Sequence, residues 1–196
     1  MLQKEGLDDI VCKHLKLKTK KAEMTDWKAM VKQVLKKKPV IEIAIVGKYI
    51  EVPDAYISIT EALKHAGYAN DADVKVKLVS AVEIEEKGAE TVLSNFKGLL
   101  IPGGSGERGI EGKLKAAEYA RLNDVPFLAI DNGLEVAAIE FAKNVMGLED
   151  ATSREFDEQA KVNIIDIMES QKSVADKDGT NRLGLYTCKL VDGTKA

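Results

Sequence analysis

The feature that most constrains the fold is a regular alternation of apolar runs and helical patterns, which begins at residue 40. Four short apolar runs are typical of buried strands: VIEIAIV (40–46), VKVKLVS (74–80), GLLIP (98–102) and VPFLAI (125–130). Three helical patterns separate them, over 55–67 with a glycine cap at Gly67, 83–95 and 111–122. Strands that alternate with helices form parallel sheets covered by helices on both faces. The sequence therefore predicts a three-layer α/β sandwich with a mostly parallel central sheet.

The segment FLAIDNGLEVAAIEFA (127–142) has the outline of a nucleophile elbow. Its apolar run ends at Asp131, Gly133 follows two residues later, and an apolar helical pattern begins at once. In such an elbow a sharp turn from strand to helix exposes one side chain. Ligands of parallel α/β sheets bind beyond the carboxyl ends of the strands. Asp131 is therefore the candidate nucleophile, or it occupies the place of a nucleophile that is absent.

A second motif competes for the same edge of the sheet. GSGERG (104–109) is a literal GxGxxG between a predicted strand and a predicted helix, and Asp131 closes the next strand. This layout is that of a dinucleotide fingerprint, in which glycines approach the pyrophosphate and an acidic residue binds the ribose. Pro102 and Gly103 intervene between strand and motif, and the unit is not the first strand of the sheet. Both features disfavour a dinucleotide site.

Charge is distributed unevenly along the chain. Residues 1–38 contain 11 Lys and 5 acidic residues, a net charge of +6, whereas the remainder has a net charge of −9. Lysine-rich segments can bind nucleic acid, but the Leu and Val residues interleaved in DDIVCKHLKL and WKAMVKQVLKKK fit amphipathic helices better. We expect a helical linker with a solvated basic face and no nucleic-acid partner.

Composition indicates a soluble, cytoplasmic chain with no membrane partner. The charged fraction is 31%, no apolar stretch approaches the roughly 20 residues that cross a bilayer, and the opening MLQKEGLDDI lacks the apolar segment of a signal peptide. Cys12 and Cys188 are neither closely spaced nor set among histidines. Neither a disulfide framework nor a metal site is predicted.

Several long segments resemble the class I glutamine amidotransferase (glutaminase) domain of CTP synthases: GKYIEVPDAYISITEALKHAG, IPGGSGERGIEGKLKAAEYAR, FLAIDNGLEVAAIEFAKNV, GLEDATSREFD and GTNRLGLYTCKL. The opening GLDDIVCKHLKL and TDWKAMV resemble the end of the synthetase domain of that enzyme and the linker after it. The resemblance implies a flavodoxin-like fold. It also implies a linker over 1–38 and an amidotransferase-like domain over 39–196.

The resemblance implies a function as well. CTP synthases are ligases of pyrimidine biosynthesis that make CTP from UTP, ATP and glutamine; their amidotransferase domain hydrolyses glutamine and sends ammonia to the synthetase domain. The implied partners are glutamine and the synthetase domain, with self-association into a homo-oligomer as a further option. No cofactor is expected in this chain, because ATP and Mg would belong to the synthetase domain.

The family's site residues can be carried over position by position. The family uses a Cys in an elbow of the form G-x-C-x-G-x-Q, a Gly-rich oxyanion loop, and a His and a Glu near the C-terminus. Asp131 stands at the nucleophile position. The resemblance assigns oxyanion and glutamine-binding roles to Gly103, Gly104, Asn132, Gly133, Leu134, Glu135 and Glu155. Among these, Glu155 matches the carboxylate that holds the amino group of glutamine.

The centre of the site departs from the family pattern. Asp131 replaces the Cys, Asn132 replaces a Leu and Glu135 replaces the Gln, and the only histidines, His14 and His65, precede the elbow. The chain stops at GTKA, before the family segment that supplies the His, the Glu and a glutamine-binding Arg. We expect a truncated, degenerate and inactive domain that binds glutamine weakly or not at all.

Two alternatives remain open. Asp131 is itself a potential covalent nucleophile, although hydrolysis of the resulting ester needs a second base. Lys48 and Asp54, in the loop after the first strand, are candidates for ligand contact or for packing against a synthetase domain. A function from another class is a non-catalytic interaction module that packs on a synthetase partner or on its own copies.

Overall fold

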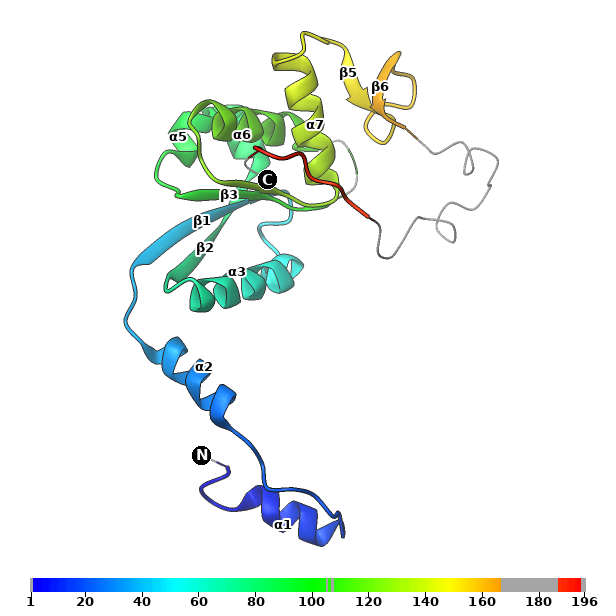
Figure 1. The fold of residues 1–196 in the computed structure, drawn as a ribbon. Helices are drawn as coiled ribbons and strands as arrows, with labels where there is room; N and C mark the ends of the chain where they lie inside the picture. The colour runs from blue at the N-terminus through cyan, green and yellow to red at the C-terminus, as the bar shows by residue number, and fades with distance from the viewer. Residues whose placement is uncertain (1, 105, 107, 167–186, 195–196) are drawn as a thin grey trace, which may run out of the picture. The chain divides into compact units, whose positions relative to one another are not determined.

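A computed structural model describes residues 2–104, 106, 108–166 and 187–194 (Figure 1). The chain divides into two compact units. The first comprises Met1–Ile41 and Tyr56–Lys75, and the second comprises Glu42–Ala55 and Val76–Ala196. The sequence-based boundary between residues 38 and 39 stays a prediction.

The first unit contains the helices α1 (Leu7–His14), α2 (Thr25–Leu35) and α3 (Ile57–Ala69). All residues of α1 and α2 are described and none is buried. At the end of α2, Lys36 pairs with Asp71 at 2.8 Å. Hydrogen bonding from Lys36 is the main cause that lowers the pKa of the Asp71 carboxyl.

The predicted glycine cap at Gly67 is wrong. Helix α3 continues to Ala69, and Gly67 is buried within it. A Cβ at this position would lie 2.8 Å from the carbonyl oxygen of Ala72 and 2.8 Å from a methyl carbon of Val74. The glycine therefore permits close packing of the chain that follows the helix and does not end the helix.

The central sheet has four strands in the order β2-β1-β3-β4. Their bounds are β1 Val40–Gly47, β2 Asp73–Ser80, β3 Gly98–Ile101 and β4 Phe127–Ala129. The pairs β1–β3 and β3–β4 are parallel, with Ile45 opposite Leu100 and Leu100 opposite Leu128. The predicted α/β fold with a mostly parallel sheet is confirmed.

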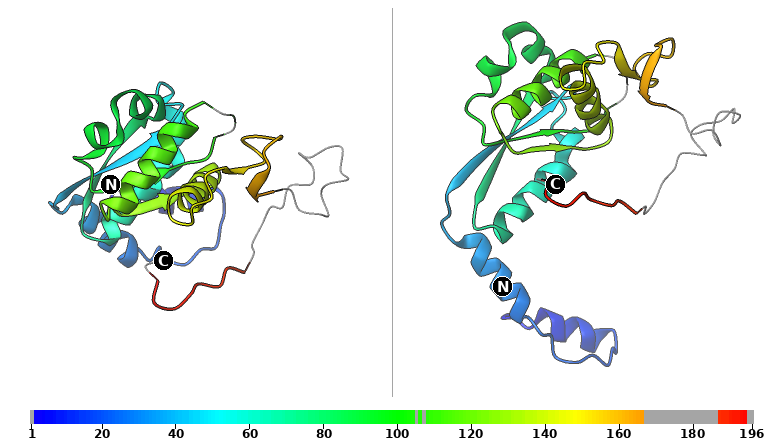
Figure 2. Two further views of the ribbon diagram at one scale, coloured as in Figure 1. Left: turned by 90° about the horizontal axis from the view of Figure 1, so that it is seen from above. Right: turned by 45° about the horizontal axis from the view of Figure 1, so that its top comes forward.

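Among the described residues of the second unit, the α-helices are α4 (Ala81–Lys87), α5 (Ala89–Leu93), α6 (Ile110–Leu122) and α7 (Asn132–Asn144). Helix α6 packs on the other three and on β3 and β4 (Figure 2). The single helix predicted over 83–95 is wrong, because the chain breaks at Gly88, which has a φ of 84°. The core includes Val46, Ile84, Leu93, Ile101 and Val136, all fully buried.

A second, two-stranded parallel sheet follows α7 and contains β5 (Ala151–Ser153) and β6 (Val162–Ile165). Strand β6 begins the segment VNIIDIM, whose apolar residues predict a short strand. The segment LGLYTCKL also predicts a short strand; it lies partly outside the described residues, and its described part, 187–190, is not a strand. Within the described ranges, no helix is both long and apolar enough to cross a membrane.

Candidate active site

Asp131 lies on a strained turn between β4 and α7. Its φ of 55° and ψ of −123° belong to a region that favours glycine. Hydrogen bonds on both sides hold the turn: the Ile130 amide donates to the Ile101 carbonyl at 3.0 Å, and the Gly133 amide donates to the Ile130 carbonyl at 2.9 Å. This conformation is that of the nucleophile elbow predicted from the sequence.

Gly133 lets α7 start against the central strand. A Cβ at this position would collide with the carbonyl oxygen of Ile101, which belongs to the fully buried end of β3. Because a backbone carbonyl in a central strand cannot move aside cheaply, only glycine fits. The tight start of α7 aims the Asp131 side chain at the loop that follows β3.

The Asp131 carboxylate lies against the Gly-rich loop. A Cβ at Gly103 would overlap Oδ2 of Asp131, so the carboxylate occupies the space above this glycine. A Cβ at the next residue, Gly104, would lie 3.6 Å from Cε of Lys48 and 4.0 Å from Nζ of Lys113. The loop is thus bordered by a carboxylate at Gly103 and by two lysines at Gly104.

The buried lysine is a feature that the sequence analysis missed. Lys113 of α6 is only 1% exposed, and its Nζ donates a hydrogen bond to Oδ1 of Asn132 at 2.9 Å. Burial, followed by the positive charge of Lys48, lowers the pKa of the Lys113 amine. The negative charges of Asp131 and Glu155 act in the opposite direction. A signal for Lys113 was present in the sequence, because it shares a helix face with the apolar positions 110, 116, 117 and 120.

Two further carboxylates face the elbow. Burial raises the pKa of Glu135, one turn into α7, and the charges of Glu155 and Asp131 raise it further, while a hydrogen bond from Ser153 opposes them. Glu155 lies just after β5, where its backbone amide donates a hydrogen bond to the Ser153 hydroxyl oxygen at 3.2 Å. Two carboxylates at the start of α7 and one that follows β5 therefore interact electrostatically.

The structure gathers nearly all the residues singled out from the sequence. One region contains Gly103, Gly104, Asp131, Asn132, Glu135 and Glu155. Gly133 packs against Ile101 beside this region. Leu134 differs, because its side chain is 62% exposed. The histidines His14 and His65 lie in the first unit, and the site lies in the second. Among the described residues, no cluster of three or more His, Cys, Asp or Glu is placed to hold a metal ion.

A separate cavity of about 710 Å³ lies at the other end of β4. Its walls include Ala117, Arg121, Phe127, Glu140 and Phe141. None of the candidate site residues lines it. Its main polar feature is the ion pair between Arg121 and Glu140 at 2.6 Å, which links α6 to α7.

Comparison with known proteins decides the family. The profile described as "Glutamine amidotransferase class-I" matches residues 51–196. The chain belongs to the class I glutamine amidotransferases.

This glutamine amidotransferase chain is similar in sequence to CTP synthases. It is 53% identical to the CTP synthase of Bacillus subtilis (strain 168) over 195 residues and 50% identical to that of Geobacillus kaustophilus over 196 residues. These matches cover 100% of this chain and 36% and 37% of those proteins, so the chain spans about a third of their length.

A solved structure described as "Trypanosoma brucei CTPS - glutaminase domain with bound acivicin" is also similar. Its TM-score is 0.63 at 33% identity, and the match covers 68% of this chain and 52% of that one. The resemblance to CTP synthase glutaminase domains is confirmed, in sequence and in fold.

Proposed function

We propose that this chain is the glutaminase part of a CTP synthase in which the nucleophile has been lost, so that the chain as it stands hydrolyses no glutamine. The observation that carries the proposal is the placement of Asp131: a carboxylate occupies the strained elbow and lies against Gly103 of the Gly-rich loop. In this family the elbow presents the attacking group and the loop donates to the oxyanion. In this chain the Asp131 carboxylate occupies the space between the elbow and the Gly-rich loop.

Charge explains why attack on an amide fails. Hydrolysis through a tetrahedral intermediate places a negative charge on the substrate oxygen, which backbone N–H groups stabilise. The Asp131 carboxylate would repel that charge at close range. Glu135 and Glu155 add to the repulsion, as their mutual effect on the pKa of Glu135 indicates. The site disfavours the transition state that a glutaminase must stabilise.

Glutamine binding should be weak for a related reason. Glu155 keeps the carboxylate that the family uses for the α-amino group. Glu135, however, replaces a neutral Gln, and Asp131 fills space beside Gly103. The favourable contact with the amino group is retained while the side-chain amide of glutamine meets additional negative charge.

The first unit would connect this domain to the synthetase part of the enzyme. Helices α1 and α2 expose apolar side chains along their length, including Leu7, Ile10, Trp27, Met30 and Leu35. Apolar faces of this kind are suited to packing on a partner. ATP, Mg and UTP would act at the synthetase part, in the cytoplasm, and this chain would hold no cofactor of its own.

A four-way comparison of glutamate release tests the proposal. The four proteins are the parent chain, Asp131→Cys, the parent joined to the remainder of the Bacillus subtilis glutaminase domain, and the combination. A thiol with a pKa of about 8.5 is only a few per cent thiolate at neutral pH and needs a base. Groups that act as a unit give non-additive losses, so only the combination should release glutamate. Substantial release by Asp131→Cys alone would show that another residue of this chain serves as the base.

An interaction module is the second candidate function, and one surface favours it. Strand β4, helix α7 and the residues just after each of them expose the apolar side chains of Leu128, Ile130, Leu134, Phe141 and Met146. A partner or a second copy that covers them would remove apolar area from water. Light scattering over a range of concentrations separates the options, since a monomer at every concentration would exclude self-association as the role of this surface.

A further inference from the structure

The buried side chains of Lys113 and Asn132 contact each other at the elbow. Hydrolysis of glutamine does not require this contact. Lys113 and Asn132 are 1% and 2% exposed. Nζ of Lys113 donates to Oδ1 of Asn132 at 2.9 Å. Because an ammonium group cannot donate to an amide nitrogen, this contact fixes the orientation of the Asn132 amide. The carbonyl carbon Cγ is thereby held next to a buried lysine nitrogen.

Neither partner is well satisfied in this arrangement. Nδ2 of Asn132 is buried and has no hydrogen-bond partner among the described residues. Native proteins rarely leave a buried donor unsatisfied. The charged form of Lys113 is disfavoured as well, because burial and the nearby charge of Lys48 lower the pKa of the amine. A lysine that is desolvated beside another cation is a stronger nucleophile.

We propose that Lys113 and Asn132 join spontaneously through an isopeptide bond between Nζ and Cγ, releasing the Asn132 amide nitrogen as ammonia. The lone pair of the neutral Nζ attacks Cγ and forms the new N–C bond. The bond between Cγ and Nδ2 then breaks. Nζ loses one proton and Nδ2 gains one, so an amine and a primary amide become a secondary amide and ammonia. No oxidant or other reactant is consumed.

Asp131 is placed to carry the proton. It precedes Asn132 directly in the chain, and its negative charge acts on Lys113. As a carboxylate it accepts the proton from Nζ, and as an acid it returns it to the departing Nδ2. The product contains neither a buried ammonium nor the unsatisfied Nδ2. Removal of these two unfavourable groups lowers the free energy of the product relative to the reactants. The bond would tie α6 to the start of α7 across a separation of 19 residues.

The mass of the purified full chain tests this inference without reference to glutamine. The intact protein should be lighter than its sequence by one ammonia. Trypsin should fail to cut after Lys113, and a branched peptide should join residues 109–115 to residues 122–143. An intact mass equal to that of the sequence, after prolonged incubation of the folded protein, would overturn the proposal. This result is independent of whether any variant folds.

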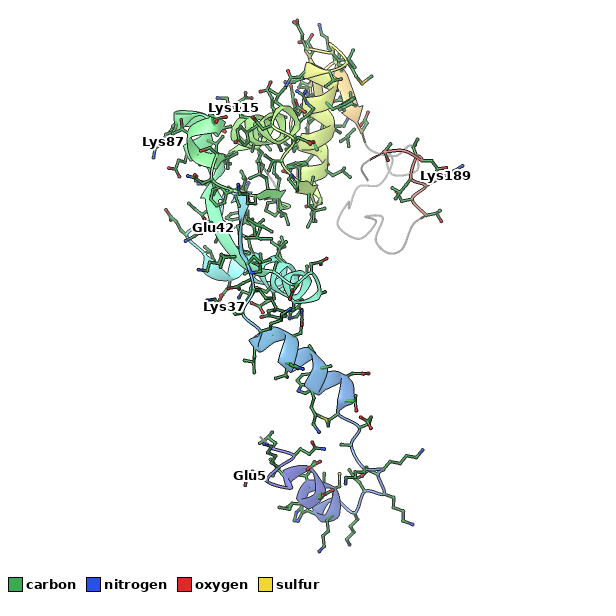
Figure 3. All side chains as sticks on the ribbon, turned by 60° about the vertical axis from the view of Figure 1, so that its left-hand side comes forward. Glu5, Lys37, Glu42, Lys87, Lys115 and Lys189 are labelled. Atoms are coloured by element: carbon green, nitrogen blue, oxygen red, sulfur yellow. The ribbon has the colours of Figure 1, made fainter. Side chains whose placement is uncertain are left out.

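Matched variants identify the reacting groups. Lys113→Met and Asn132→Leu should keep the full mass expected for their sequences. Lys115→Met should lose ammonia like the parent. Lys115, which is labelled in Figure 3, lies on the same helix, and its Nζ donates a hydrogen bond to the carbonyl of Glu85 at 3.4 Å. A succinimide at Asn132 and Gly133 would also release ammonia but would not need the lysine. Loss of ammonia that persists in Lys113→Met would therefore contradict the isopeptide bond.

Discussion

The strain at the elbow predicts that a glycine at position 131 stabilises the fold. A non-glycine residue in a sparsely populated backbone region costs about 1–3 kcal/mol. Glycine removes this cost, although its greater freedom in the unfolded chain returns about 0.5–1 kcal/mol. Asp131→Ala is the matched control, because it removes the same carboxylate and keeps the strain. Asp131→Gly should therefore have a free energy of unfolding about 1 kcal/mol higher than that of Asp131→Ala.

The difference is measurable by thermal unfolding. For a chain of this size, about 1 kcal/mol corresponds to a shift in Tm of roughly 2–4 °C. Far-ultraviolet circular dichroism is the suitable signal, because the single Trp27 lies in α2 of the first unit and is 59% exposed. If Asp131→Gly melts at or below the temperature of Asp131→Ala, the backbone at the elbow is not strained, and the comparison with a nucleophile elbow fails.

Three further changes have defined outcomes in equilibrium unfolding. Gly133→Ala should destabilise the fold by about 1–3 kcal/mol, because a Cβ collides with a strand carbonyl; a neutral effect would show that α7 can shift. Arg121→Met should cost about 1.5–3 kcal/mol, because it removes the cationic partner of Glu140, which is 3% exposed, and leaves the hydrogen bond from Asn144. Lys87→Met, which breaks an exposed pair, should leave the melting curve nearly unchanged; equal effects would refute this distinction. Burial raises the pKa of Glu135 above its ordinary value, so the folded state binds this proton more tightly than the unfolded state. The free energy of unfolding should therefore fall as pH rises from the unfolded pKa through the folded one. Glu135→Gln should remove that fall, and an unchanged pH profile would count against it.

The elbow and the Gly-rich loop could be predicted because their signals are local. An apolar strand, a charged residue and a glycine at fixed spacing define the turn at Asp131, and the positive φ at that residue bears the prediction out. The Lys113 contact could not be predicted in the same way. It joins side chains of two helices, from residues that are 19 positions apart in sequence, and a lysine on a helix is usually solvated. Only its position on an apolar face indicated burial.

Glycines were the main source of error in the helices. Gly67 was interpreted as a cap, although its lack of a side chain serves close packing against Ala72. Gly88 lies inside the single helix predicted over 83–95, although its φ of 84° separates α4 from α5. A glycine in a sequence does not reveal whether it serves backbone conformation or close approach, because that distinction depends on tertiary neighbours.

The release of ammonia from glutamine tests whether an aspartate at the elbow leaves this domain without glutaminase activity. Glutamine labelled with heavy nitrogen at the side-chain amide separates substrate turnover from any unlabelled ammonia that the protein itself releases. We expect no labelled ammonia above a protein-free control. Labelled ammonia produced at a rate within a hundredfold of an ordinary enzyme, on the order of 10 per second, would contradict it.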